Sequence, residues 1–198
     1  QEEIRQGADS PARVASELLY ATAFSQHPYG RPVLGTAASI ASLGSERVLD
    51  FCRRWYVPGN VTLVVAGDVD ADAVLAKIRR SFGRWGSGRP PERRRLAEPV
   101  QRALRVRVDG QNIRQAQIAV GFHIPAIGQD DGPLVDLLSV VLGQGDSSRL
   151  VLRVERAHEL LDQVRAYAYT PRDPGLLVVS GSTSPDKLVA GSVVFLAG

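Results

Sequence analysis

Residues 164–181, Val-Arg-Ala-Tyr-Ala-Tyr-Thr-Pro-Arg-Asp-Pro-Gly-Leu-Leu-Val-Val-Ser-Gly, contain the pattern that decides the fold class. Residues 164–170 alternate in the way that a strand with two different faces requires. Residues 171–175 hold two prolines, an aspartate and a glycine, which are turn-forming residues. Residues 176–181 are apolar and rich in branched side chains, which favours another strand. The stretch therefore predicts two consecutive strands joined by a turn.

The residues before this stretch predict two more strands and two helices. Residues 103–109 alternate as a strand, and residues 116–123 form a second strand after a turn. Amphipathic helices are expected at 130–142 and 147–158, and Ser184-Pro185 opens a last helix. The order is strand, strand, helix, helix, strand, strand, helix. We therefore expect an α+β fold whose antiparallel or mixed sheet has helices packed on one face.

The first 83 residues are richer in helix. Ser10-Pro11 opens a helix that is expected to run to about Gln26, where His27-Pro28 stops it. Ser45 opens another helix, and Asp70 or Asp68 precedes a helix over 71–82. Residues 61–67, Val-Thr-Leu-Val-Val-Ala-Gly, are apolar on both faces and predict a buried strand.

A segment without periodicity separates these two blocks. It is rich in Gly, Pro and Arg, which predicts a linker over 84–102. The predicted domains are 1–83 and 103–198. The basic run at 93–95 is only three residues long, so a solvated linker explains it better than a nucleic-acid surface.

Composition excludes several classes of protein. Lys and Arg number 24 against 21 Asp and Glu, and this net charge of +3 over 198 residues is too dilute to imply a nucleic-acid partner. No apolar run has the length of a membrane span. The single Cys52 allows no intramolecular disulfide. The chain has no Met and begins at Gln1, so we expect a fragment, a processed chain or an expressed domain.

Three motifs fall short of a functional site. Residues 143–150 resemble a phosphate loop, but they lack its spacing and its Lys, so a glycine turn between helices is the better interpretation. Residues 68–72 begin like a calcium loop, but Ala73 and Arg79 stand at positions that need Gly and Glu. His158-Glu159 is one residue short of a zinc motif, so structural roles are expected for the three histidines, His27, His123 and His158.

Several segments together resemble the pitrilysin/insulinase family of zinc metallopeptidases, the inverzincin group that includes mitochondrial processing peptidase. The similarity covers about residues 1–188, in the family's own order. The segments of the first block are Glu2-Glu3-Ile4-Arg5, residues 27–36 (His-Pro-Tyr-Gly-Arg-Pro-Val-Leu-Gly-Thr), and residues 56–60 leading into 61–68. Those of the second block are residues 115–125, Asp130-Asp131, residues 138–145, Ser147-Ser148-Arg149-Leu150 and residues 169–175.

The resemblance implies a two-domain peptidase that closes like a clam shell over peptides or small proteins. The family's zinc-binding H-x-x-E-H helix would lie upstream of Gln1, and its third ligand is a Glu that corresponds to Glu3 here. The resemblance therefore implies zinc in the parent protein. This chain itself is expected to bind no cofactor and to be inactive, because a single carboxylate holds zinc poorly.

One departure from the family concerns two substrate-binding residues of the second domain. Aligning Ser148-Arg149-Leu150 with the family places Glu155 where an Arg is expected and Asp162 where a Tyr is expected. The pair is lost. Some bacterial members divide the work between two subunits, so the resemblance implies a heterodimer with a homologous Arg/Tyr-bearing subunit. Such bacterial relatives are often periplasmic, which gives the expected location.

The sequence thus predicts a portion of a zinc metalloendopeptidase. The first alternative is a non-catalytic structural or substrate-holding subunit of a processing-peptidase-like complex, and the second is a basic nucleic-acid-binding module. Because the family's two domains are homologous, residues 61–67 are expected to join the sheet of the second block, as in one circularly permuted domain. A domain-swapped dimer would satisfy the same strand edges.

Overall fold

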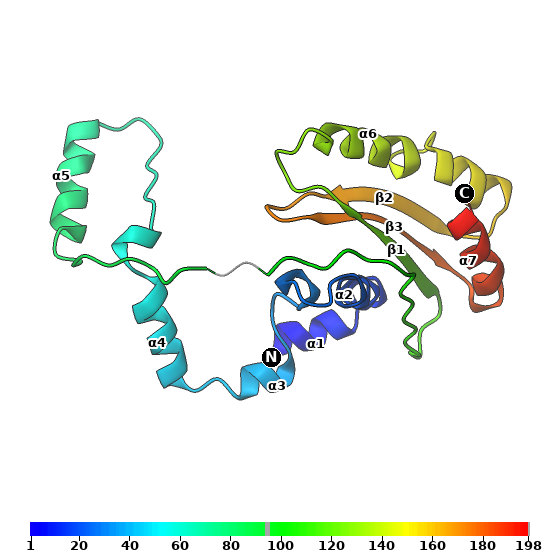
Figure 1. Ribbon diagram of the computed structural model, residues 1–198, viewed down its shortest axis with the longest axis horizontal. Coiled ribbons are helices and arrows are strands. Elements are labelled where there is room, and N and C mark those ends of the chain that lie inside the picture. Colours follow the sequence, from blue (N-terminus) through cyan, green and yellow to red (C-terminus); the bar gives the residue numbers. More distant parts are fainter. Residues whose placement is uncertain (94–95, 198) are drawn as a thin grey trace. The chain divides into compact units, whose positions relative to one another are not determined.

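The computed structural model describes residues 1–93 and 96–197. They form two compact units (Figure 1), which we call the sheet unit, Gln1–Gly35 with Leu96–Gly198, and the helical unit, Thr36–Arg95. Each is described by itself below. Arg94 and Arg95 of the basic run lie outside the described residues.

The sheet unit is built on three antiparallel strands. These are β1 (Ala116–Ile124), β2 (Gln163–Tyr169) and β3 (Gly175–Thr183), in the order β1-β3-β2. The predicted strand–turn–strand is confirmed: β2 and β3 pair with Tyr169 opposite Leu176. β3 lies in the centre, so both of its edges are paired. Both of its faces are covered by helices, as described below, which explains its run of apolar residues.

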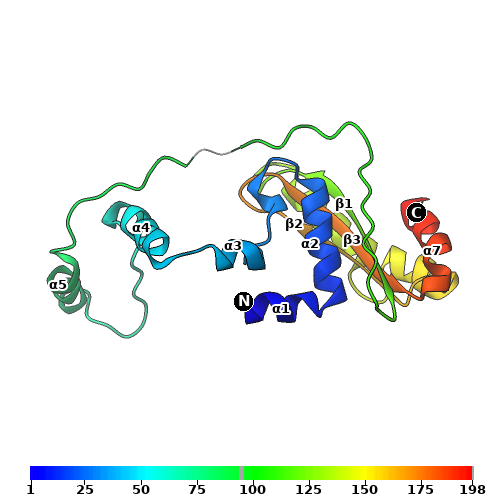
Figure 2. The same ribbon diagram turned by 90° about the horizontal axis from the view of Figure 1, so that it is seen from below.

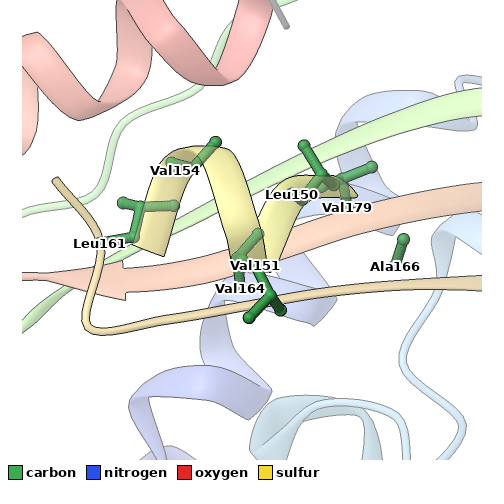
Figure 3. Close-up of a cluster of buried hydrophobic side chains, with 7 residues drawn as sticks. All are labelled: Leu150, Val151, Val154, Leu161, Val164, Ala166 and Val179. Atoms are coloured by element: carbon green, nitrogen blue, oxygen red, sulfur yellow. The ribbon is translucent and has the colours of Figure 1, made fainter. Parts of the chain in front are cut away.

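One face of the sheet is covered by α6 (Gly132–Gly143) and by η3 (Val151–Ala157), which has a π-helical turn. Their side chains and those of the sheet form a buried apolar cluster (Figure 3) of Leu150, Val151, Val154, Leu161, Val164, Ala166 and Val179. At the end of α6 the helix comes against the backbone of β2, where a Cβ on Gly143 would overlap the backbone nitrogen of Ala166. Only glycine fits at that position.

The opposite face is covered by α2 (Pro11–Ala23), which follows α1 (Glu2–Ala8) and lies across the sheet on the side away from α6 (Figures 1 and 2). A second buried cluster forms there from Ala23, Phe24, Leu176 and Val178. The α+β class with an antiparallel sheet is therefore confirmed. α2 covers a second face of the sheet, so residues from the two ends of the chain build one core.

The helical unit has a different character. It contains α3 (Ala37–Ala41), α4 (Ser45–Trp55), η2 (Pro58–Asn60) and α5 (Ala71–Phe82). Asp70 caps α5 by accepting a hydrogen bond from the N–H of Ala73 at 2.7 Å, so the expected helix over 71–82 forms. Between residues 36 and 93, every described residue is exposed or half-buried. The unit therefore has no buried core of its own in the part of the chain that is described.

Two expected strands are not formed. Residues 61–67 and 103–109 belong to no strand, and residues 61–67 do not join the sheet. A strand needs a neighbouring strand for its backbone hydrogen bonds, and an apolar pattern alone does not supply one. The helix that was expected to reach Gln26 ends at Ala23, because the N–H groups of residues 25–27 bond to Glu98 instead.

The last elements are η1 (Pro28–Gly30), between α2 and α3, and η4 (Pro185–Lys187) and α7 (Leu188–Ala197), which follow β3. Among the residues that the structure describes, no helix is both long and apolar enough to cross a membrane.

Candidate functional site

Glu3, the residue that corresponds to a zinc ligand in the family, lies on α1 and is exposed. Within residues 1–93 and 96–197, no three His, Cys, Asp or Glu side chains lie close enough together to hold a metal ion. A catalytic zinc needs three protein ligands. The described residues of this chain therefore do not fit zinc, and no chemical step through the metal follows from them.

The two positions of the lost Arg/Tyr pair lie in different elements. Glu155 is half-buried on η3, whereas Asp162 is exposed directly before β2. The Asp162 carboxylate accepts a hydrogen bond from Gln115 Nε2 at 2.9 Å. The backbone N–H of Asp162 donates to the carbonyl of Ser182 at 2.8 Å. Asp162 thus ties the start of β1 to the start of β2, across the end of β3. This is a structural role for that side chain.

Several polar groups surround His27. Its side chain is 7% exposed, its Nδ1 accepts a hydrogen bond from the N–H of Tyr29 at 3.2 Å, and its Nε2 lies 3.5 Å from Asp173 Oδ2. The N–H of Asp173 donates to the Tyr29 hydroxyl at 3.3 Å. These contacts join η1 to the turn between β2 and β3. The expected structural role is confirmed for His27, whereas His158 is exposed.

Aromatic rings fill the space between α2, η1 and the sheet. Phe24 lies 5.6 Å from Tyr29 and 5.1 Å from His123 between ring centroids, and Tyr20 lies 6.1 Å from Tyr169. Burial, followed by the nearby phenols of Tyr167 and Tyr169, raises the pKa of Tyr20 to about 12. These edge-to-face contacts fix the position of α2 on the sheet.

Glu98 holds the turn that follows α2. Its carboxylate accepts hydrogen bonds from the N–H groups of Ser25, Gln26 and His27 and from the Ser25 hydroxyl, at 2.7 to 2.9 Å. Burial of its side chain raises the pKa of Glu98, but these donors, first the N–H groups of Gln26 and His27, outweigh burial and lower it to about 2.

Arg105 completes the same arrangement. Its Nη1 donates to the carbonyls of Thr22 and Ala23 at 3.2 and 2.8 Å and lies 3.6 Å from Glu98 Oε1. A cation at the C-terminus of a helix is favourable, because the last carbonyls lack partners within the helix. Glu98, which lies within the predicted linker, and Arg105, which follows it, thus attach this part of the chain to the end of α2.

The sequence indicated only part of this group. His27-Pro28 signalled the end of a helix, but Glu98 and Arg105 lie more than seventy residues away from their partners, and no local pattern connects them. The members of the group bond to each other, and His27 is buried. This geometry suits anchoring of α2 to the sheet.

A family model described as the peptidase M16 inactive domain matches residues 42–197. An uncharacterized zinc protease of Streptomyces coelicolor is 30% identical over 194 residues, which cover 94% of this chain and 42% of that protein. An uncharacterized zinc protease of Mycobacterium tuberculosis is 30% identical over 188 residues, which cover 94% of this chain and 43% of that protein. The chain thus spans less than half the length of these relatives.

Solved structures show the same fold. A protease from Helicobacter pylori matches 98% of this chain and 49% of its own, with a TM-score of 0.81 at 24% identity. A peptidase M16 inactive domain from Pseudomonas fluorescens matches 99% of this chain and 48% of its own, with a TM-score of 0.77 at 19% identity.

Proposed function

The chain belongs to the peptidase M16 inactive-domain family, and from this membership we propose that it is a non-catalytic portion of a zinc-dependent metalloendopeptidase. The match over residues 42–197 carries the proposal, and the zinc proteases among its relatives support it. The family membership confirms the resemblance to the pitrilysin/insulinase zinc peptidases. Cleavage of peptides within a two-domain chamber is the activity proposed for the whole protein.

In this proposal the parts of the longer protein divide the work. A preceding segment supplies the H-x-x-E-H helix, and Glu3 adds the third zinc ligand. The domain assignment of 1–83 and 103–198 as halves of two homologous domains remains part of the proposal. The helical unit supports it, because its exposed apolar side chains, such as Phe51, Leu63 and Phe82, need a surface to pack against.

Peptide hydrolysis in the family also uses an Arg and a Tyr, whose positions hold Glu155 and Asp162 here. We therefore propose that a homologous subunit supplies this pair in a heterodimer. The bonds of Asp162 to Gln115 and Ser182 support a structural role for that position in place of a catalytic one. The description of the matched family as an inactive domain favours, as a second candidate, a subunit that only holds the substrate.

The test uses the complete encoded protein, with Glu3→Gln and the neighbouring Glu2→Gln as its matched control. Both side chains are exposed on α1, so neither change should disturb folding. Zinc content and hydrolysis of an unstructured peptide are measured for each variant, with and without the homologous subunit. We expect Glu3→Gln to lower zinc content and activity at least ~10-fold, because loss of even a hydrogen-bonding partner of a metal ligand has an effect of that size. Glu2→Gln should change neither.

Three results would count against parts of the proposal. Full zinc content in Glu3→Gln would show that Glu3 is not a ligand. Full activity of the complete protein without a partner would remove the heterodimer. If the segment before Gln1 has no H-x-x-E-H sequence, the substrate-holding subunit becomes the better assignment.

A further inference from the structure

Aspartate is followed directly by glycine at two places in the chain, Asp109-Gly110 before β1 and Asp131-Gly132 at the start of α6. Both aspartates are exposed. In an Asp-Gly sequence the side-chain carboxyl group lies next to a peptide nitrogen whose own residue has no Cβ to obstruct an approach. The two sites therefore contain the same reactive groups, and the structure around them decides whether these groups can meet.

Nothing in the structure holds the Asp109-Gly110 peptide in place. Residues 104–113 belong to no helix or strand, and the N–H of Gly110 has no hydrogen-bond partner among the described residues. A Cβ added at Gly110 would meet nothing within 4 Å. Nε2 of Gln111 donates to Asp109 Oδ2 at 3.1 Å, which keeps the carboxyl group beside this stretch of backbone. The peptide nitrogen of Gly110 is thus free to turn toward the carboxyl carbon of Asp109.

The Asp131-Gly132 peptide is held on both sides. The N–H of Gly132 donates to the carbonyl of Gln129 at 3.0 Å, and the carbonyl of Asp131 accepts from the N–H of Val135 at 3.1 Å, within the first turn of α6. Asp131 has the helical backbone angles φ −80° and ψ −7°. At this ψ the Gly132 nitrogen points away from the Cβ side of the Asp131 residue. An attack on the Asp131 carboxyl group therefore requires the start of α6 to open.

We propose that Asp109 is a site of spontaneous isoaspartate formation and that Asp131 is protected from the same reaction by its hydrogen bonds. The nitrogen of Gly110 attacks Cγ of the protonated Asp109 carboxyl group, and its proton leaves with the hydroxyl group as water, which closes a succinimide ring. Water then opens the ring. Cleavage at the α-carbonyl carbon of Asp109 leaves the chain connected through Cγ, as isoaspartate, whereas cleavage at Cγ restores aspartate. Water lost in the first step is regained in the second, so no oxidant or reductant is needed.

The modification changes the connection between α2 and the sheet. Arg105 bonds to the carbonyls at the end of α2, and β1 begins at Ala116, so Asp109 lies between these two fixed points. Isoaspartate adds a methylene group to the main chain there and leaves an exposed α-carboxylate. Such a carboxylate is the substrate of carboxyl methyltransferases that recognise isoaspartate and use S-adenosylmethionine. The proposal rests on the chemistry of this segment and does not depend on the proposed function.

The test compares the two sites within the same 198-residue chain, incubated at neutral pH and physiological temperature with and without guanidinium chloride. Peptide mapping locates isoaspartate, and an isoaspartyl methyltransferase with labelled S-adenosylmethionine measures its amount. We expect Asp109 to accumulate isoaspartate at least ~10-fold faster than Asp131 in the folded chain, because a hydrogen-bonded site reacts only when it opens locally. In denaturant the two rates should agree within about threefold, because both sites then lack their native structure.

Two glycine variants provide a matched control. A Cβ meets open space at both Gly110 and Gly132, so both alanine variants should fold, which circular dichroism checks. Gly110→Ala should lower the total isoaspartate of the folded chain several-fold, because the new Cβ obstructs the attack, whereas Gly132→Ala should leave the total unchanged. Equal rates at Asp109 and Asp131 in the folded chain would overturn the proposal. Isoaspartate that forms at Asp109 in denaturant alone would overturn it as well.

Discussion

Leu176 in β3 and Leu63 in the segment 61–67 lie in equally apolar stretches, yet Leu176 is 0% exposed and Leu63 is 52% exposed. The difference comes from their surroundings. Leu176 lies between two strands and beneath α2, whereas the segment 61–67 has no neighbouring strand among the described residues of the helical unit. An apolar sequence pattern therefore shows that a segment is able to be buried. Whether it is buried depends on a neighbouring strand or helix that packs against it.

The sheet unit obtains those second elements from both ends of the chain. α2 from the N-terminal block and α6 from the second block cover opposite faces of one sheet. The helical unit has amphipathic helices without such a partner among its described residues. In physical terms, the stability of the 198-residue chain should come almost entirely from the sheet unit.

The largest contrast is expected for two leucines. Leu176→Ala should lower the free energy of unfolding by about 2–5 kcal/mol, because it leaves a cavity between β3 and α2. Leu63→Ala, its matched control, should change it by less than about 0.5 kcal/mol. Urea unfolding followed by circular dichroism measures both. Equal losses would mean that residues 61–67 are buried in solution, and the comparison between the two units would fail.

A glycine pair within α6 tests how closely that helix approaches the sheet. Gly143→Ala should destabilise the chain by about 1–3 kcal/mol, because its Cβ would overlap the backbone at Ala166. Gly132→Ala at the other end of the same helix meets open space and should be neutral or slightly stabilising. Thermal unfolding of the two variants distinguishes them. A stable Gly143→Ala variant would show that α6 lies farther from β2.

Glu98 makes the attachment of α2 depend on pH. Because its pKa is lowered from 4.5 to about 2, its stabilising contribution is complete above about pH 4.5 and is lost as the pH falls toward 2. Glu98→Gln should lower the free energy of unfolding by about 1–3 kcal/mol at pH 7, the usual value for hydrogen bonds to a charged group. The deficit should shrink between pH 4.5 and 2.

The control for this variant is Glu92→Gln, since Glu92 is exposed in the predicted linker. Urea titrations at several pH values compare the variants. A Glu98→Gln deficit that stays constant from pH 7 to pH 2.5 would show that the carboxylate charge does not hold the turn.

The sequence predicted the helices and strands whose causes lie in neighbouring residues, and it failed where the cause lies far away in the chain. The helix over 71–82 followed from Asp70 and its apolar spacing, and the pair of strands β2 and β3 followed from alternation around a turn. Family resemblance was readable from ordered short segments. The prediction of a strand over 61–67 was wrong, because the apolar pattern of a segment cannot show whether a neighbouring strand exists to pair with it. The partners of Glu98, which lie in the turn after α2, were missed for the same reason.

Hydrogen exchange of the 198-residue chain tests the central claim most directly, namely that the sheet unit contains the core and the helical unit does not. We predict protection above about 10⁴-fold for the amides of residues 176–179, which should open only with global unfolding. The amides of α4 and α5 should show protection below about 10-fold, since helices of this length are marginal without packing. Comparable protection in α4, α5 and β3 would contradict the account.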